Sequence, residues 1–261
     1  MPFFLRALSL SHIMRKMKNK KLKAILSITG YFLVIIALCV SAGFVFHSLY
    51  YELIYVSGIS MAPTLNGAEK EQAGSVVDFG IMDTHASTLK RIKRFSIVST
   101  YYPDDTDYDS STGKLKINAK QKIKRVIALP GESFRIENGK LFVNGDYIPY
   151  TFKINYGSNI NVKDINHEDT PLGKDEYWVL GDNRSNSRDS GSLNLAVKEE
   201  NLIGVLIAIE GEGQLKIKNY CCDQCGKTYN KQPNNCSKCG GNSFTTQYDL
   251  TNKKYIWPKY Y

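Results

Sequence analysis

Three short polar segments of this sequence carry residue types that could do chemistry. Ser60 lies in SGISMAPT (residues 57–64), Lys124 lies in the apolar run Ile123–Leu129, and the third segment is GDNRSNSRDS (residues 181–190). A serine hydroxyl becomes a good nucleophile when a nearby base takes its proton. A lysine can be that base if burial lowers its pKa. The three segments together therefore suggest a serine nucleophile that is activated by a lysine.

The segment around Ser60 is expected to be an irregular turn. Pro63 blocks a helix before it, and Ser57 and Gly58 favour other conformations. Glycine also lets a ligand come close to the backbone. The alternative is a plain linker turn with no chemistry, and the segment alone does not exclude it.

Lys124 is expected to lie in a buried strand. Alternation along Ile123–Leu129 puts it on one face with Val126 and Ala128. Acting as a base near pH 7 requires its pKa to fall by about three units, which costs roughly 4 kcal/mol. The alternative is an edge-strand lysine whose ammonium group reaches solvent.

Histidine is a poor candidate for the base. The chain has four histidines, and none lies in a segment that resembles a catalytic motif: His12, His47, His85 and His167. The sequence also lacks the HExxH pattern of a metalloprotease. A Ser–Lys pair, a known variant of the catalytic triad, is the remaining option.

The three segments, in this order behind one apolar run, resemble those of bacterial type I signal peptidases. These are membrane-bound Ser–Lys proteases, and the resemblance covers about residues 24–210. It implies that Ser60 is the nucleophile and Lys124 the general base, and that Ser187 positions the lysine ammonium. It further implies supporting roles for Asp182, Arg125 and Asp189, and an oxyanion hole on the turn that holds Gly58, Met61 and Pro63. No cofactor is expected for catalysis.

The sequence departs from the family pattern at three places. Gly58 stands where some members have a serine that donates to the oxyanion, Gly191 replaces an arginine, and Ala128 replaces a glycine. An ion pair to Asp189 would then be missing, unless Arg188 supplies it. The eukaryotic branch has histidine at the position of Lys124, so the resemblance is to the bacterial type.

One segment has the length of a membrane span. Residues 24–46 run for 23 positions without a charge, after a segment 1–23 that holds seven Lys/Arg and no acid. Basic residues favour the cytoplasm, so we expect a single-pass anchor in the cell membrane with a cytoplasmic N-terminus and an extracytoplasmic catalytic domain. The alternative is a cleaved secretory signal, whose apolar stretch is usually shorter.

The remaining sequence predicts a mainly β protein. Strands are expected near 76–79, 95–102, 123–129, 176–180 and 202–209, and tight hairpins at Asn138-Gly139 and Asn144-Gly145. We expect a peptidase domain over 47–213 of antiparallel, signal-peptidase-like fold. Of the net charge of +9, the segment 1–23 holds +7 and residues 215–261 hold +6, which leaves −4 for the body. This distribution argues against binding of nucleic acid.

The C-terminal tail, residues 214–261, carries a second motif. Its array CxxC–x10–CxxC (Cys222, Cys225, Cys236 and Cys239) has the spacing of a structural zinc ribbon, which signal peptidases do not generally carry. Two disulfides are the alternative, because the expected topology puts the tail outside the cell. Cys221 is left over in either case. The eight lysines of the tail are a solvated surface or a contact for anionic lipid.

The resemblance implies a substrate class and partners. Signal peptidases cut after small residues at positions −1 and −3 of precursor proteins that are tethered in the same membrane. The expected partners are therefore these precursors, the lipid bilayer and the secretion translocon. Two other functions remain open: a membrane-anchored binding module that works through the ribbon, and a self-cleaving Ser–Lys regulator of the repressor type. Such regulators are cytosolic, so the apolar segment argues against the second.

Overall fold

A computed structural model describes residues 20–102, 107–109, 111–157 and 164–261. The chain divides into two compact units, Met1–Tyr50 and Tyr51–Tyr261. Most of the predicted basic segment 1–23 lies outside the described residues.

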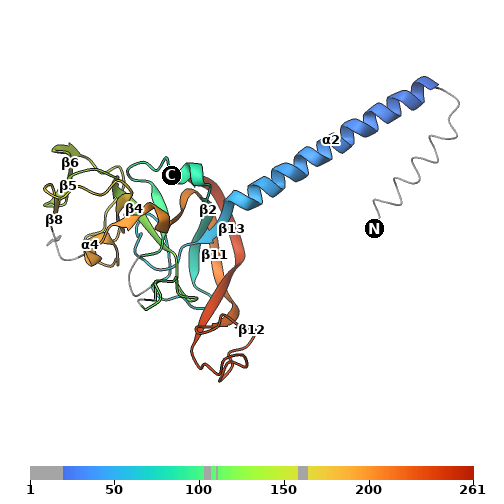
Figure 1. The fold of residues 1–261 in the computed structure, drawn as a ribbon. Helices are drawn as coiled ribbons and strands as arrows, with labels where there is room; N and C mark the ends of the chain where they lie inside the picture. Colours follow the sequence, from blue (N-terminus) through green and yellow to red (C-terminus); the bar gives the residue numbers. More distant parts are fainter. Residues whose placement is uncertain (1–19, 103–106, 110, 158–163) are drawn as a thin grey trace. The chain divides into compact units, whose positions relative to one another are not determined.

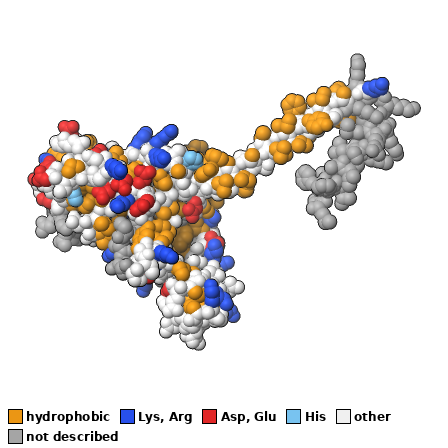
Figure 2. All heavy atoms as spheres, viewed as in Figure 1, with side chains coloured by type: hydrophobic (Ala, Val, Ile, Leu, Met, Phe, Trp, Pro, Cys, Tyr) orange, Lys and Arg blue, Asp and Glu red, His pale blue; other side chains and the backbone are white. Residues whose placement is uncertain are grey.

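The N-terminal unit is built on one long helix, α2 (Lys20–Tyr50; Figure 1). Its 31 residues span roughly 46 Å at 1.5 Å per residue, which exceeds the thickness of a bilayer core. Apolar side chains cover its surface (Figure 2) and are exposed over Ala24–Tyr50, where the mean hydropathy is 2.4. Among the described residues this is the one helix long and apolar enough to cross a membrane.

The second unit is mainly β, as predicted. Its larger sheet has the order β1-β2-β11-β3-β4-β9-β10, and all of these strand pairs are antiparallel. The strands are β1 (Tyr51–Tyr55), β2 (Val76–Asp83), β3 (Ile97–Thr100), β4 (Lys122–Ala128), β9 (Glu176–Leu180), β10 (Val197–Lys198) and β11 (Leu202–Cys222). Short helical turns lie between them at α3 (Ala86–Leu89), α4 (Ser190–Leu193) and η1 (Glu199–Asn201).

A smaller sheet has the order β7-β6-β5-β8. Its strands are β5 (Phe134–Glu137), β6 (Lys140–Val143), β7 (Asp146–Ile148) and β8 (Ile165–His167). Both predicted hairpins form, because Asn138-Gly139 and Asn144-Gly145 adopt positive φ at all four residues, as tight turns between antiparallel strands require.

The C-terminal residues extend the larger sheet. Strand β13 (Phe244–Tyr260) returns along β11 from Cys222↔Phe244 to Ala208↔Tyr260, and the short β12 (Thr228–Tyr229) pairs with the far end of β11 (Figure 1). The predicted strand 202–209 is therefore only the first part of a strand of 21 residues. The expected boundary between residues 213 and 214 falls inside this continuous strand.

Apolar side chains form three buried clusters in this unit. One lies around Trp178 and Phe134, one around Met61 and Leu206, and one around Tyr102. Strand β4 contributes to two of them, Val126 to the Tyr102 cluster and Ile127 to the Trp178 cluster, so both of its faces are buried. Lys124 therefore lies in a strand that is well inside the domain.

Close packing of β2 against β11 predicts the effect of one substitution. A Cβ on Gly80 would lie 2.1 Å from the backbone oxygen of Ala208. Gly80→Ala should lower the free energy of unfolding by about 2 kcal/mol or more, because backbone must shift to accept it. Thermal unfolding in detergent measures the loss. Gly173→Ala is the control, since its added Cβ meets only the flexible side chain of Glu176 and should cost less. Equal losses would contradict the prediction.

Candidate active site

The structure brings Ser60 and Lys124 into contact. Lys124 Nζ lies 2.8 Å from Ser60 Oγ, although the two residues are 64 positions apart in the sequence. Ser60 lies on the predicted irregular turn, and Lys124 extends from β4, where it pairs with Val98 of β3. The lysine also donates a hydrogen bond of 3.0 Å to the backbone oxygen of Ile123, which helps to hold its amine in place.

The environment of Lys124 favours the neutral amine. Its side chain is buried, with 3% of the residue exposed, and this burial lowers its pKa from 10.5 to about 8. The carboxylates of Asp189 and Asp182 act in the opposite direction, while the charge of Lys122 lowers the pKa further. Burial is the largest cause, so the neighbouring side chains that exclude water set the basicity of this amine.

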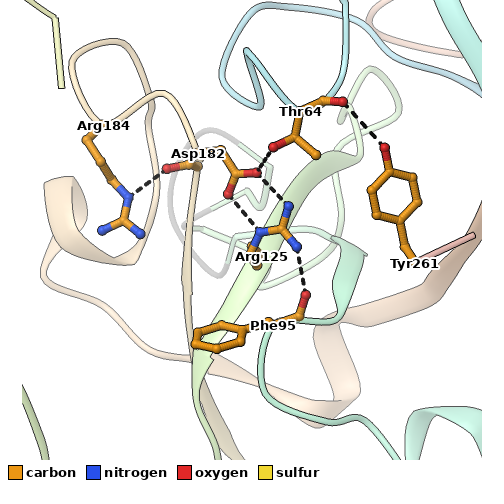
Figure 3. A network of polar contacts seen from close by, with 7 residues as sticks. Thr64, Phe95, Arg125, Asp182, Arg184 and Tyr261 are labelled. Atoms are coloured by element: carbon orange, nitrogen blue, oxygen red, sulfur yellow. Dashed lines mark hydrogen bonds and ion pairs between the residues drawn. The ribbon is translucent and has the colours of Figure 1, made fainter. Parts of the chain in front are cut away.

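Arg125 and Asp182 form a buried ion pair next to the dyad (Figure 3). The guanidinium donates from Nε to Asp182 Oδ1 at 2.8 Å and from Nη2 to Oδ2 at 2.6 Å. Asp182 Oδ2 also accepts from Thr64 Oγ1 at 2.6 Å, and Arg125 Nη1 donates to the backbone oxygen of Phe95 at 2.9 Å. The guanidinium stacks 3.9 Å from the ring centre of Phe152. This network joins the turn that holds Ser60 to β4 and to the loop after β9.

The loop 181–190 is attached directly to the Ser60 turn. The backbone N–H of Asn183 donates to the backbone oxygen of Ser60 at 2.9 Å, and its side-chain amide donates to that of Ile59 at 3.1 Å. A Cβ on Gly181 would lie 2.5 Å from the oxygen of Ser60 and 2.3 Å from Ser187 Oγ. Only glycine permits this close approach, so Gly181 is required for the loop to pack against the turn that holds Ser60.

Ser187 is packed into the site, but it does not make the expected hydrogen bond in this structure. Its Oγ is buried and has no hydrogen-bond partner among the described residues. Lys124 Nζ instead donates to Ser60 Oγ and to the backbone oxygen of Ile123. The position of Ser187 beside Gly181 agrees with a place in the site, whereas its action on the ammonium stays a prediction.

Asp189 organises the end of the loop. Its carboxylate accepts from the backbone N–H of Gly181 at 2.9 Å and caps helix α4 by accepting from Gly191 and Ser192 at 3.1 and 3.2 Å. The Ser192 hydroxyl accepts in return from the N–H of Asp189 at 2.8 Å, which completes a capping box. Backbone N–H groups, including that of Gly191, therefore stabilise the buried carboxylate of Asp189.

The remaining residues of the turn have distinct environments. Gly58 has φ of +78°, which favours glycine, and Gly67 packs against its backbone so closely that a Cβ there would lie 1.9 Å from Gly58 O. Met61 is buried in the apolar core beneath the turn. Pro63 is exposed. The turn is thus anchored by Met61 and shaped by two glycines.

A cleft of about 670 Å³ opens beside the dyad. Ser60 and Lys124 line it together with apolar side chains, among them Ile54 and Met82. The same cleft continues to residues 117–122 and to the C-terminal strands, where Cys221 and Thr246 line it. An extended polypeptide has room to reach the dyad along such a cleft.

The four predicted metal ligands lie together at the far end of β11. The thiols of Cys222, Cys225, Cys236 and Cys239 are all within 4.8 Å of one another. Neighbouring sulfurs are 3.5 to 3.6 Å apart, near the spacing of roughly 3.8 Å that a tetrahedron with Zn–S bonds of about 2.3 Å requires. Gly226 and Gly240 each follow a CxxC pair with positive φ, which permits a tight turn around a metal ion. The chemistry of this donor set fits a structural zinc ion.

Thr64 and Asn183 make contacts in the site that the sequence alone does not indicate. Both lie in the polar segments described above, 57–64 and 181–190, but hydroxyl and amide side chains are common in turns and do not by themselves indicate a role. Their function depends on contacts over long separations, 118 residues from Thr64 to Asp182 and 124 from Asn183 to Ile59. A single sequence carries no signal of such distances.

The buried ion pair leads to a testable prediction. Asp182→Ala should lower the free energy of unfolding by about 3–5 kcal/mol, because the charge of Arg125 would stay buried without its partner. The double variant Arg125→Met/Asp182→Leu should lose less than Asp182→Ala alone. Thermal unfolding of the wild type and of the two variants tests this. A double variant that loses as much stability as Asp182→Ala, or more, would contradict the prediction.

Comparisons with known proteins identify the family of this chain. The sequence profile of the family described as "Signal peptidase, peptidase S26" matches residues 28–209. The chain is 31% identical to signal peptidase I V of Bacillus subtilis over 58% of this chain and 80% of that protein, and 26% identical to signal peptidase I U of the same organism over 72% and 87%.

A solved signal peptidase I from Enterococcus faecalis aligns with 44% of this chain and 96% of its own, at 24% identity and a TM-score of 0.34. The family profile covers well over half of the sequence, from within helix α2 to strand β11, and includes all three polar segments. The chain is therefore a member of the signal peptidase family, peptidase S26.

Proposed function

We propose that this protein is a membrane-anchored endopeptidase that removes signal peptides from exported precursors, with Ser60 as nucleophile and Lys124 as general base. The observation that carries the proposal is the 2.8 Å contact between Ser60 Oγ and a buried amine whose pKa is about 8. At pH 7 about a tenth of such an amine is neutral, compared with less than a thousandth at its ordinary pKa.

The first step forms an acyl-enzyme. The Ser60 hydroxyl transfers its proton to the neutral amine of Lys124 as Oγ attacks the carbonyl carbon of the scissile bond. The C–N bond then breaks, and the ammonium of Lys124 gives this proton to the leaving amine. In the second step Lys124 takes a proton from water as the water oxygen attacks the ester, and its ammonium returns this proton to Ser60 Oγ when the ester bond breaks. One lysine therefore serves both steps and returns to its neutral form.

The oxyanion of each step is stabilised mainly by backbone donors. The N–H of Ser60 is one donor, and a single such donor is worth about 2.7–4 kcal/mol in the transition state. Gly58 has no side chain to donate, and its positive φ disfavours the serine that some family members carry at this position. The turn is held in place for this task by the two bonds from Asn183.

Ser187, Asp182, Arg125 and Asp189 act as positioning residues in this proposal. The ion pair and the cap described above hold β4 and the loop 181–190 around the dyad. The buried hydroxyl of Ser187 has no partner among the described residues and is available to accept a hydrogen bond from the Lys124 ammonium. Such a bond would orient the amine after it takes the proton.

The substrate and the topology follow from family membership. Precursors with small residues at −1 and −3 would enter the cleft, and larger side chains would be excluded sterically. Helix α2 fits a single-pass anchor, and we propose a cytoplasmic N-terminus and an extracytoplasmic catalytic unit near the translocon. Sharing a membrane with the precursor raises the effective concentration of substrate.

The four cysteines hold a structural zinc ion in this proposal. A site closed by four thiolates leaves no position open for substrate, so the metal would stabilise the fold without taking part in cleavage. The segment that carries these cysteines, residues 222–239, would form a metal knuckle that connects β11 to β13.

The dyad is tested by precursor processing in membranes. Ser60→Ala and Lys124→Ala should each abolish cleavage, while Lys140→Ala, an exposed lysine on β6, should retain it. Because the base must be neutral, kcat/KM of the wild type should rise about tenfold per pH unit below pH 8 and level off above it. Cleavage by either dyad variant at the wild-type rate would refute the assignment.

The metal site is tested by elemental analysis and thiol counting. The wild type should contain one zinc ion per chain, and Cys236→Ser should lose it because a ligand is gone. Cys221→Ser is the matched control: this cysteine is adjacent to a ligand but outside the cluster, so zinc should remain. Two disulfides in the wild-type tail, with no zinc, would contradict the proposal.

A further inference from the structure

The cleft beside the dyad has two walls of different origin. Near Ser60 it is lined by the body of the domain. At its other end it is lined by the C-terminal arm, which is the C-terminal tail, residues 214–261. The arm residues that line it are Lys218, Cys221, Thr245, Thr246, Gln247 and Tyr248. The arm is thus part of the same cleft as the dyad.

The arm is fixed to the body at several points. Tyr248 OH donates to the backbone oxygen of Glu71 at 3.0 Å, and the carboxylate of Glu71 pairs with Lys120 on the neighbouring wall. At the other end of β13, the N–H of Tyr261 donates to the backbone oxygen of Ile207 at 3.1 Å. The hydroxyl of Tyr261 donates to the oxygen of Thr64 at 3.4 Å, at the end of the nucleophile turn (Figure 3). The Tyr248 contact therefore fixes the arm beside the cleft, and the Tyr261 contacts fix the end of the arm to the body of the domain.

The cysteine knuckle braces the end of this wall. Along β11, Cys221 lines the cleft whereas the next residue, Cys222, belongs to the metal cluster. Asp223 accepts hydrogen bonds from Ser243 Oγ at 2.5 Å and from Thr245 Oγ1 at 2.6 Å, which ties the knuckle to the lining strand. A Cβ on Gly226 would touch Ile117 at 3.4 Å, so the knuckle also lies against the opposite wall. A metal held there would therefore fix both sides of the cleft's far end.

We propose that the C-terminal arm is an additional binding surface for the precursor polypeptide, held in shape by the metal knuckle. This inference rests on the proposed function, and it extends the substrate contact beyond the residues that adjoin the cut. The occupant is the precursor itself, because the surface is continuous with the cleft that holds Ser60 and Lys124. The arm should then matter for long substrates and have little effect on short ones.

The test compares two substrates with the full chain in proteoliposomes. One is an intact precursor, and the other is a short peptide that covers only the residues around its cleavage site. Thr246→Trp places a large side chain in the part of the cleft that the arm lines. The ratio of kcat/KM for the precursor to kcat/KM for the peptide should then fall about tenfold, which is the effect of losing contacts in one pocket. Thr251→Trp, on the same strand but outside the lining of the cleft, is the matched control and should leave the ratio unchanged.

A second variant tests the knuckle independently. Cys236→Ser should lose its metal and show a similar fall in the ratio, since the wall would no longer be braced. An unchanged ratio in both Thr246→Trp and Cys236→Ser, with the peptide still cleaved, would overturn this inference alone. An equal fall in Thr251→Trp would also overturn it. A wild-type protein that cleaves neither substrate would instead overturn the proposed function and the inference with it.

Discussion

The burial of one amine beside one hydroxyl is the constraint on which this structure depends. Lowering the pKa of Lys124 from 10.5 to about 8 costs about 3 kcal/mol at pH 7, because the unfolded chain binds a proton that the folded chain holds less tightly. Stability should accordingly rise with pH between about 8 and 10.5. The fold offsets this cost with the apolar clusters on both sides of β4. Basicity and packing are therefore linked: a looser core would solvate the lysine and return its pKa toward the ordinary value.

Arg125, the next residue of the same strand, is also buried, but it stays charged. Its guanidinium cannot lose its proton, so its buried charge needs a partner of opposite charge. Asp182 supplies that charge in a bidentate pair, and Thr64 holds the carboxylate from the nucleophile turn. Adjacent residues of β4 thus meet the burial of a base in two ways: desolvation lowers the pKa of Lys124, and an ion pair compensates the permanent charge of Arg125. The second also ties together the three segments of the site.

Much of this architecture could be predicted from the sequence. The apolar helix, the mainly β body and the Asn-Gly hairpins are confirmed, because they depend on composition and local turn chemistry. The full length of β11 does not follow from the sequence: the predicted strand ends at residue 209, yet the strand continues through Gly211 and Gly213 with shifts of register. Ser60, Lys124 and the loop 181–190 were chosen for their residue types and for a family resemblance. Their distances, and the contacts of Thr64 and Asn183, depend on the tertiary fold and could not be read from one sequence.

The two ends of the segment that holds the cysteine knuckle lie side by side on the sheet, which affects how the sequence of this segment can change between relatives. Cys222 and Phe244 are paired neighbours on β11 and β13, so the 21 residues between them begin and end at one point of the sheet. Such a segment can be exchanged as a cassette, since any loop that closes the same short gap preserves the ladder behind it. Relatives could then differ completely in the sequence of this segment while sharing β11 and β13. The catalytic body would keep one chemistry, and selection could alter the outer end of its cleft independently.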